Sequence, residues 1–308
     1  MNIRTGRRTA GKRKMRIKAV ILAGILAAGV LAGCGKSKEP IKIASKPMTE
    51  QYILTEILGQ LIEHDLGVKT EITKGIGGGT TNIQPALLKG DFDLYPEYTG
   101  TAWMTVLKHE KEDDPEVLYE SLQKEYQEMG LQWSGLYGFQ NSYVLAVRKE
   151  AAQEYGLETF SDLAAASGNL VFGGNPDYME RADGYPMICE AYGMDFKGTV
   201  DVDIALKYQA MANKEIDVTN AFTTDAQLAA ADVKLLQDDK SLFATYYAGT
   251  VVRTDTLEKY PGLADTLEKL TGRISDDEMR EMNYQVEVEG KDEKEIAKDF
   301  LTQKGLLN

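Results

Sequence analysis

The chain has few of the residues on which most catalytic and metal sites depend. Only two cysteines and two histidines occur among 308 residues, which excludes a disulfide-rich scaffold and leaves little for a histidine triad or a zinc site. Gly35-Lys36-Ser37 lacks the earlier glycine of a phosphate-binding loop, and Gly75-Ile76-Gly77 lacks the third glycine of a dinucleotide-binding loop. These absences argue against an enzyme and predict that the protein needs neither a cofactor nor a metal.

The chain also lacks an excess of positive charge. Its formal net charge is -13, and eight of its 35 basic residues lie within the first 18 positions, ahead of the first acidic residue, Glu39. Without residues 1–33, 27 basic residues face 48 acidic ones, a net charge of -21. A surface this acidic repels nucleic acid, so no DNA or RNA partner is expected. The length is about twice that of a typical domain of ~150 residues, which predicts two lobes.

No apolar run is long enough for a comfortable transmembrane helix, which needs ~20 residues. Residues 19–33 are uncharged and follow the basic stretch, a pattern typical of a secretory signal. The run ends at Leu31-Ala32-Gly33-Cys34, which resembles the bacterial lipobox, where the cysteine is lipidated and becomes the mature N-terminus. We expect a signal peptide over residues 1–33 and a lipidated Cys34 with a tether over residues 34–40. A plain signal peptide or a short anchor is the alternative. Cys189 is then expected to be a buried free thiol.

From residue 41 onward, short strand patterns alternate with helix patterns. An amphipathic stripe from Ile53 to Ile62 predicts a helix packed on a sheet. The glycine-rich residues 75–79 are interpreted as a strand-to-helix turn, with a backbone contact to ligand as the alternative. Over residues 41–95 this rhythm predicts a parallel sheet with ligand-facing loops at the carboxyl ends of its strands. The alternation along the whole chain predicts two α/β lobes, the first interrupted by the second. The expected strands are 41–45, 69–73, 92–95, 142–147, 170–172, 216–218, 233–236 and 246–253, and the expected helices include one through residue 88, one over 160–166, and those starting near residues 185 and 203.

Two motifs closely resemble one transport family. SKPMTEQYIL at residues 45–54 and GDFDLYPEYTGT at residues 90–101 are similar to segments of the substrate-binding proteins of osmoprotectant ABC transporters, in the glycine betaine/carnitine/choline family of OpuC and ProX type. The resemblance runs from about residue 41 to the C-terminus. Shorter matches are Asn141-Ser142-Tyr143, Arg181-Ala182-Asp183-Gly184-Tyr185, Thr223-Thr224-Asp225 and Asp238-Asp239-Lys240.

The resemblance implies a type II periplasmic-binding-protein fold, an α/β architecture of two lobes with the ligand in the cleft between them. Lobe I is expected to comprise residues 41–143 and 247–308, and lobe II residues 144–246. The chain then crosses between lobes near residues 143–147 and 247–251.

In that family a quaternary ammonium group lies in a cage of aromatic rings. A methylated cation cannot donate hydrogen bonds, so ring quadrupoles and apolar contact replace them. By motif position, the resemblance assigns the cage to Tyr98, Tyr143, Tyr246 and Phe222. Relatives usually carry tyrosine where this chain has Phe222, a departure that leaves the ligand's identity open.

The resemblance also assigns residues to the ligand's polar end. Arg181 is placed near a carboxylate, which a guanidinium fork matches in geometry. Choline has no carboxylate, so Arg181 favours a betaine or carnitine. Further polar candidates are Lys46, Gln51, Thr101 and Asn141.

The function implied is that of an extracellular solute-binding protein of an ABC importer. It captures a quaternary ammonium osmoprotectant, such as glycine betaine, carnitine, choline or a related betaine, and delivers it to a permease. The expected partners are this small molecule, the ABC permease and ATPase subunits, and the cell membrane, to whose outer face a lipid anchor holds a monomeric protein. Three alternatives remain: a sensing or adhesion lipoprotein of the same fold, import of a non-osmolyte betaine such as a histidine-derived one, and an enzyme acting on a cationic solute.

The lipobox predicts that Cys34→Ala releases the protein to the medium or blocks removal of the signal. Several lipid chains hold a protein firmly at a membrane, whereas one chain binds only marginally. Cell fractionation and incorporation of a labelled fatty acid measure the effect, with Cys189→Ala as the control that keeps membrane retention. Normal processing and full retention of the Cys34→Ala variant would contradict lipidation.

Overall fold

The computed structural model describes Met1 and residues 39–180, 184–203 and 206–307. The predicted signal peptide, Cys34 and Arg181 therefore lie outside the described residues. Residues from Pro40 onward form one compact unit, and within its described part no helix has the length and apolarity to span a membrane.

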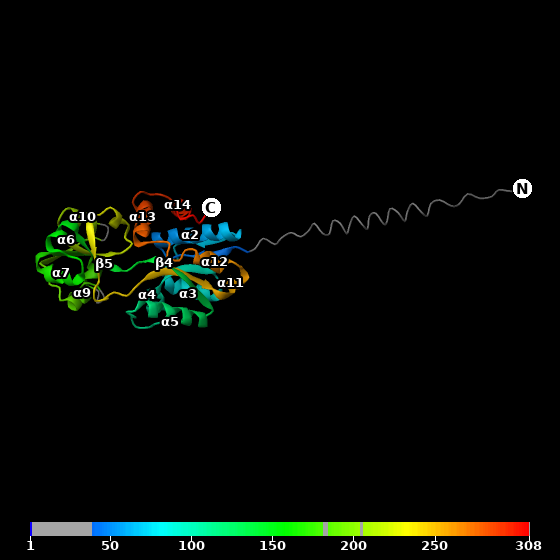
Figure 1. The fold of residues 1–308 in the computed structure, drawn as a ribbon, viewed down its shortest axis with the longest axis horizontal. Helices are drawn as coiled ribbons and strands as arrows, with labels where there is room; N and C mark the ends of the chain where they lie inside the picture. Colours follow the sequence, from blue (N-terminus) through cyan, green and yellow to red (C-terminus); the bar gives the residue numbers. More distant parts are fainter. Residues whose placement is uncertain (2–38, 181–183, 204–205, 308) are drawn as a thin grey trace. The chain divides into compact units, whose positions relative to one another are not determined.

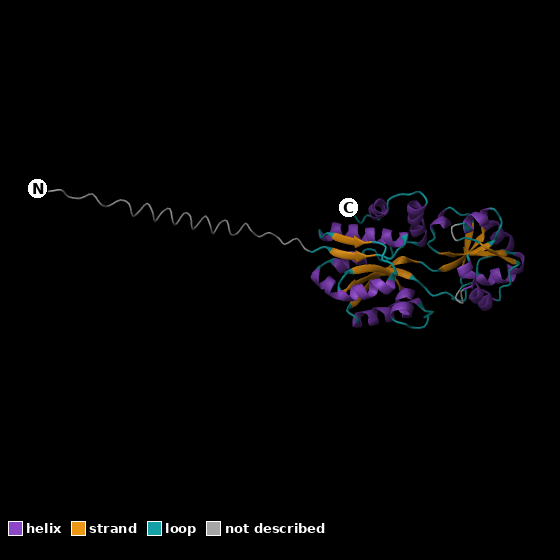
Figure 2. Ribbon diagram, turned by 180° about the vertical axis from the view of Figure 1, so that it is seen from behind, coloured by secondary structure: helices purple, strands orange, loops and turns teal. Residues whose placement is uncertain are grey.

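Two five-stranded sheets organise this unit, each with helices packed against it (Figures 1 and 2). We call the halves built on them the first and the second lobe. The first sheet has the strand order β2 (Thr70–Thr73), β1 (Ile41–Ala44), β3 (Leu94–Tyr98), β10 (Tyr247–Arg253) and β4 (Leu131–Gln140). The second has the order β7 (Gly198–Asp201), β6 (Val171–Gly174), β8 (Val218–Phe222), β5 (Tyr143–Arg148) and β9 (Val233–Leu236).

Both sheets are mixed: the parallel pairing predicted for the first three strands is confirmed, and antiparallel strands complete each sheet. In the first sheet β1 pairs in parallel with β2 and β3, whereas β10 runs antiparallel to both β3 and β4. In the second sheet β6 pairs in parallel with β7 and β8, whereas β5 runs antiparallel to β8 and β9. The antiparallel strands β5 and β10 are the first strands that the chain forms after it passes from one lobe to the other. They do not follow a local β-α-β crossover, which is the connection that makes neighbouring strands parallel.

Helices cover both faces of the first sheet. On one face the long helix α2 (Thr49–Leu66) buries an apolar stripe that includes Ile53, Ile57 and Leu61. It is capped by Gly67, whose φ of 60° is readily adopted by glycine. On this side lie also α12 (Leu263–Glu268), α13 (Asp276–Glu287) and α14 (Glu293–Gln303), which pack on α2. The opposite face carries α3 (Thr80–Lys89), α4 (Thr99–Thr101), the π-helical turn η1 (Ala102–Val106) and α5 (Pro115–Glu128), while α11 (Thr254–Lys259) follows β10.

The second sheet is also buried on both faces. Along β5, Leu145 and Val147 belong to one apolar cluster, and Val144 and Ala146 belong to the other. This explains why the strand reads as a continuous apolar run. The helices of this lobe are α6 (Lys149–Tyr155), α7 (Phe160–Ala166), α8 (Pro176–Glu180), α9 (Tyr185–Tyr192) and α10 (Lys207–Ala212), with 3₁₀ turns η2 (Ser167–Asn169) and η3 (Ala226–Ala229).

Several predicted element bounds are wrong. Strand β3 extends to Tyr98 instead of ending at Tyr95, although it contains Pro96, a residue that usually argues against a central strand. A strand was predicted over residues 216–218, whereas β8 only begins at Val218. The helix predicted to start near Asp203 begins at Lys207. Strand β4 was not predicted, because Gly135 and Gly138 interrupt its alternation, and its pairing with β10 contains register shifts.

Three connections join the lobes. Between β4 and β5 the chain passes from one sheet to the other within Asn141 and Ser142. It returns through Tyr246, whose backbone oxygen accepts a hydrogen bond from the Asn141 amide at 3.0 Å and whose amide donates to the Ser142 hydroxyl at 3.3 Å. The third connection is helix α13, whose side chains hydrogen-bond to backbone oxygens just after β8. The two predicted crossings therefore run side by side, and α13 adds a contact that the sequence did not predict.

Candidate functional site

An aromatic cluster lies where β5 begins and β8 ends. Tyr143 and Phe222 are directly opposed in the register of these strands, and their ring centroids are 4.6 Å apart. Phe243 lies 5.3 Å and Tyr178 5.9 Å from the Tyr143 ring, measured between centroids. Two of the four predicted cage residues thus lie together in the second lobe, with further rings behind them.

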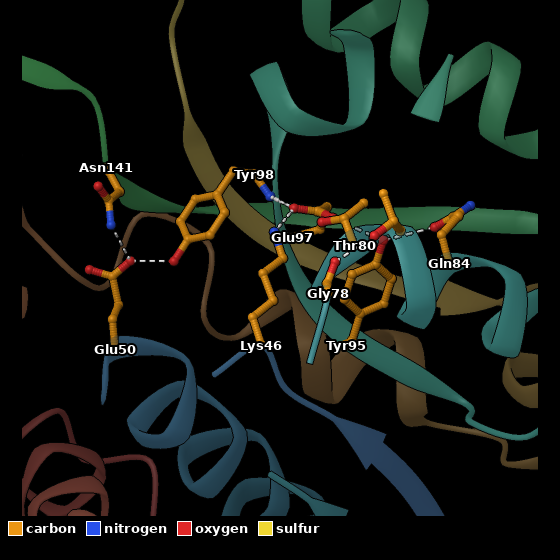
Figure 3. Close-up of polar contacts among 10 residues, drawn as sticks. Lys46, Glu50, Gly78, Thr80, Gln84, Tyr95, Glu97, Tyr98 and Asn141 are labelled. Atoms are coloured by element: carbon orange, nitrogen blue, oxygen red, sulfur yellow. Dashed lines mark hydrogen bonds and ion pairs between the residues drawn. The ribbon is translucent and has the colours of Figure 1, made fainter. Parts of the chain in front are cut away.

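Tyr98, the last residue of β3, is held at both ends by buried carboxylates. Its hydroxyl donates to Glu50 and its backbone amide donates to Glu97 at 2.6 Å (Figure 3). Burial, followed by the nearby Glu50 charge, raises the pKa of the Tyr98 hydroxyl well above its ordinary value, so this group remains a donor. The ring orientation of Tyr98 is therefore fixed by the protein before any ligand arrives.

Lys46 contacts the same tyrosine. Its Nζ lies 4.6 Å from the centroid of the Tyr98 ring and forms an ion pair with Glu97, which is completely buried. Glu97 also accepts hydrogen bonds from the Thr80 hydroxyl at 2.6 Å and the Tyr95 hydroxyl at 3.0 Å. The positive charge of Lys46 is therefore already compensated, which makes it a weaker partner for a ligand carboxylate than the sequence suggested.

Glu50 is a site residue that the sequence did not predict. It is 2% exposed, and its carboxylate accepts from the Tyr98 hydroxyl, from Asn141 Nδ2 at 3.1 Å and from Asn283 Nδ2 at 3.4 Å. Burial raises the pKa of Glu50, while hydrogen bonds from Tyr98, Thr224, Asn141 and Asn283 oppose that rise. The feature of the sequence that could have indicated Glu50 is its position directly before Gln51, a predicted ligand residue, in the family motif at residues 45–54.

Glu50, Asn141 and Asn283 line a small cavity of about 180 Å³ between the lobes. Its walls include the predicted site residues Asn141 and Phe222. They carry three acidic side chains and neither lysine nor arginine, and one of the three acids, Asp225, forms an ion pair with Lys207 at 2.7 Å. The potential of such a wall favours a cation. The lining is Met48, Thr49, Glu50, Asn141, Phe222, Thr224, Asp225, Ala226, Asn283 and Glu287.

Tyr246 and Thr101 lie near the crossings. The Tyr246 ring packs against Gly100, where an added side-chain carbon would lie 2.8 Å from the ring and 2.7 Å from the Thr245 oxygen. Thr101 ends helix α4 and is half-buried. Gln51 is completely buried, and neither of its amide atoms has a hydrogen-bond partner of ordinary geometry among the described residues, although it lies close enough to influence the Tyr98 hydroxyl.

The structure therefore links most of the predicted ligand residues. Tyr98 and Asn141 meet through Glu50, Asn141 and Phe222 line one cavity, and Tyr143 stacks beside Phe222. Tyr246 joins this set through its backbone contact with Asn141. Arg181 lies outside the described residues, and the ligand roles of all of these residues stay predictions.

The glycine-rich residues 75–79 connect β2 to α3. The Gly75 and Ile76 amides donate to the hydroxyl and the backbone oxygen of Ser45, and α3 begins directly afterwards, which agrees with a turn.

The two histidines have carboxylate partners: His64 contacts Asp65, and His109 contacts Glu125. Burial raises the pKa of the half-buried Cys189 thiol. Among the described residues, no group of three or more histidine, cysteine, aspartate or glutamate side chains is arranged to hold a metal ion.

The profile of the OpuAC family, described as the substrate-binding domain of ABC-type glycine betaine transport systems, matches residues 39–303. The chain is 47% identical over 271 residues to a Helicobacter pylori (strain G27) protein named ergothioneine transport permease/ergothioneine binding protein EgtU. That match covers 87% of this chain and 48% of the other, so the chain spans about half the length of that relative.

Two further similarities extend over most of both chains. The carnitine transport binding protein OpuCC of Listeria monocytogenes is 37% identical, with 87% of each chain covered. A crystal structure described as a glycine betaine/carnitine/choline ABC transporter superposes with a TM-score of 0.83 at 34% identity, covering 87% of this chain and all of the other.

The close approach at Gly100 generates a prediction. Gly100→Ala places a methyl group against the Tyr246 ring and the Thr245 oxygen, so we expect the free energy of unfolding to fall by ~1–3 kcal/mol. Gly198→Ala is the matched control, because nothing lies within 4 Å of the added carbon there. Urea unfolding measures both. Equal stabilities for Gly100→Ala and the wild type would show that the segment before β10 yields without cost.

Proposed function

The chain belongs to the family of substrate-binding domains of ABC-type glycine betaine transport systems, and from this premise we propose that it captures a quaternary ammonium solute outside the cell for delivery to an ABC permease. The family is one of transport proteins rather than enzymes. The observation that carries the proposal is the ring pair of Tyr143 and Phe222, because Phe222 also lines an acidic cavity that has neither lysine nor arginine in its lining.

The physical argument is that a trimethylammonium group needs negative potential without hydrogen-bond acceptors in direct contact. Aromatic faces supply this potential, and each desolvated cation–π contact contributes up to ~2 kcal/mol. A micromolar dissociation constant corresponds to about 8 kcal/mol, so several rings supply much of it. Tyr98, Tyr143, Tyr246 and Phe222 are the rings we assign to the cation.

A betaine with additional N–H groups is the second candidate ligand. The 47% identical Helicobacter pylori protein is named for ergothioneine, a histidine-derived betaine. The Glu50 carboxylate, Asn141 and Asn283 in the cavity wall offer hydrogen-bonding groups that a small osmolyte does not need. Phe222, where the family resemblance led us to expect tyrosine, is a further departure from the pattern expected of an osmolyte binder. Arg181 is proposed to bind the carboxylate in either case, with Lys46, Gln51 and Thr101 as lesser contacts.

The proposal includes the setting of the protein. We assign the lobes at the predicted bounds, residues 41–143 and 247–308 for lobe I and residues 144–246 for lobe II, except that Tyr143 begins β5 and so belongs with the second lobe. We place the mature protein as a monomer on the outer face of the cell membrane, held by lipid on Cys34. Partners in this setting are the permease and ATPase subunits, and no catalytic step is part of the function.

The aromatic cage predicts the effect of removing its rings. Tyr98→Ala, Tyr143→Ala and Tyr246→Ala should each weaken binding by about tenfold or more, because each removes a cation–π contact. Phe222→Tyr should be mild and should change the ranking of solutes. Calorimetric titration with glycine betaine, L-carnitine, choline and ergothioneine measures these effects.

The matched control for these tyrosines is Tyr155→Ala, which removes an exposed ring on α6 and should bind as the wild type does. Arg181→Ala should reduce the affinity for carboxylate-bearing solutes much more than that for choline. Wild-type affinities for all three tyrosine variants would exclude the cage.

The proposed function further predicts closure of the lobes around the ligand. The cage residues come from both lobes, so a bound cation stabilises the closed arrangement relative to the open one. Small-angle X-ray scattering should show a smaller radius of gyration when the preferred solute is added. An unchanged radius of gyration at saturating ligand would indicate a rigid site.

A further inference from the structure

Helix α13 holds the backbone of the second lobe directly beside the cage. Arg280 Nη1 donates to the Thr223 oxygen at 2.7 Å, and Asn283 Nδ2 donates to the Thr224 oxygen at 2.9 Å. Both acceptors immediately follow Phe222 at the end of β8. Because α13 packs on α2 of the first lobe as well, these two hydrogen bonds resist separation of the lobes.

Glu50 connects this clamp to the cage. One carboxylate oxygen, Oε1, accepts from the Tyr98 hydroxyl and from Asn141 in the crossing segment (Figure 3). The other oxygen, Oε2, accepts from Asn283, which at the same time donates to the Thr224 oxygen of the second lobe. A single buried side chain therefore contacts a cage ring, a hinge segment and the clamp helix.

We propose that Glu50 is a positioning residue that couples the ring of Tyr98 to closure of the lobes through Asn141 and Asn283. The coupling concerns closure itself; its effect on ligand affinity rests on the function proposed above. When the lobes separate, Asn283 loses the Thr224 oxygen, and the hydrogen bonds that hold Glu50 and thus the Tyr98 ring change with it.

The carboxylate is chemically suited to this role. Burying a carboxylate is costly unless its oxygens accept hydrogen bonds, so its presence here calls for an explanation beyond packing. Ionised carboxylates only accept, so all three neighbours must turn a donor toward Glu50. This orients the Asn283 amide with its Nδ2 toward both Glu50 and the Thr224 oxygen.

A glutamine at this position keeps the shape and breaks the pattern. If the NH₂ group of the glutamine faces Asn283 Nδ2, two donors face each other. If it faces Tyr98 and Asn141 instead, it meets two groups that donate to the native carboxylate. If Asn283 flips to accept from the new amide, its oxygen faces the Thr224 oxygen and the bond to the second lobe is lost. Glu50→Gln should therefore favour the open state without leaving a cavity.

The experiment measures the distance between the lobes in the ligand-free protein. Spin labels are placed on the exposed residues Glu128 of α5 and Gln153 of α6, in a full-length chain in which both native cysteines are alanine. Glu50→Gln and Asn283→Ala should each shift the distance distribution away from that of the closed arrangement, and their double variant should shift it no further. The matched control is Glu56→Gln, on the same helix, where the residue is 9% exposed and its carboxylate is paired with Lys74 at 2.8 Å.

Calorimetry with ergothioneine, L-carnitine and glycine betaine completes the test. For whichever solute the wild type binds, each single variant should raise the dissociation constant about tenfold, since apparent affinity scales with the closed fraction. The double variant should be no weaker than the worse single variant, within about twofold. If the Glu50→Gln variant does not fold, the distances between the spin labels in the Asn283→Ala variant decide whether the coupling holds.

Wild-type distance distributions in both variants, or wild-type affinities, would overturn the coupling, as would purely additive effects. If the wild type binds none of the three solutes, the proposed function fails, and the distances in the ligand-free protein still decide whether Glu50 couples the two elements.

Discussion

The structure depends on two buried carboxylates that hold one tyrosine. Glu97 fixes the backbone end of Tyr98, Glu50 fixes its hydroxyl, and Lys46 lies over its ring while neutralising Glu97. A methylated cation offers no hydrogen bond with which to orient its own binding site, so the protein has to orient the rings in advance. The acids also contribute negative potential without needing to touch the ligand.

The same constraint relates ligand binding to the motion of the lobes. The rings assigned to the cation come from β3, β5, β8 and the segment before β10, so a complete cage requires both lobes. The crossings at Asn141 and Tyr246 are hydrogen-bonded to each other, and the proposed movement of the lobes occurs about this short shared segment. Helix α13 opposes that movement from a third place, so the stability of the closed state depends on more than the ligand.

Much of the fold follows from patterns in the sequence, whereas the interior of the site does not. The stripe on α2 and the apolar run of β5 identify these elements, because burial sets the spacing of their apolar residues. The second half of β3 was not predicted, because proline usually argues against a central strand and the strand contains Pro96. The surrounding sheet overrides this local preference. Glu50 and Asn283 are 233 positions apart and meet only through tertiary packing, so no local spacing predicts their contact. The family resemblance predicted the ring positions, whereas their hydrogen-bond partners came only from the structure.

The central claim is that the site recognises methylation of the cation, and paired calorimetric titrations test it most directly. Each candidate solute is compared with its unmethylated amine: glycine betaine with glycine, choline with ethanolamine, and ergothioneine with 2-thiohistidine. An ammonium group facing rings leaves N–H donors unsatisfied, at ~1–3 kcal/mol each. We expect the preferred methylated solute to bind about a hundredfold more tightly than its unmethylated counterpart. Equal affinities within the pair would contradict recognition by an aromatic cage.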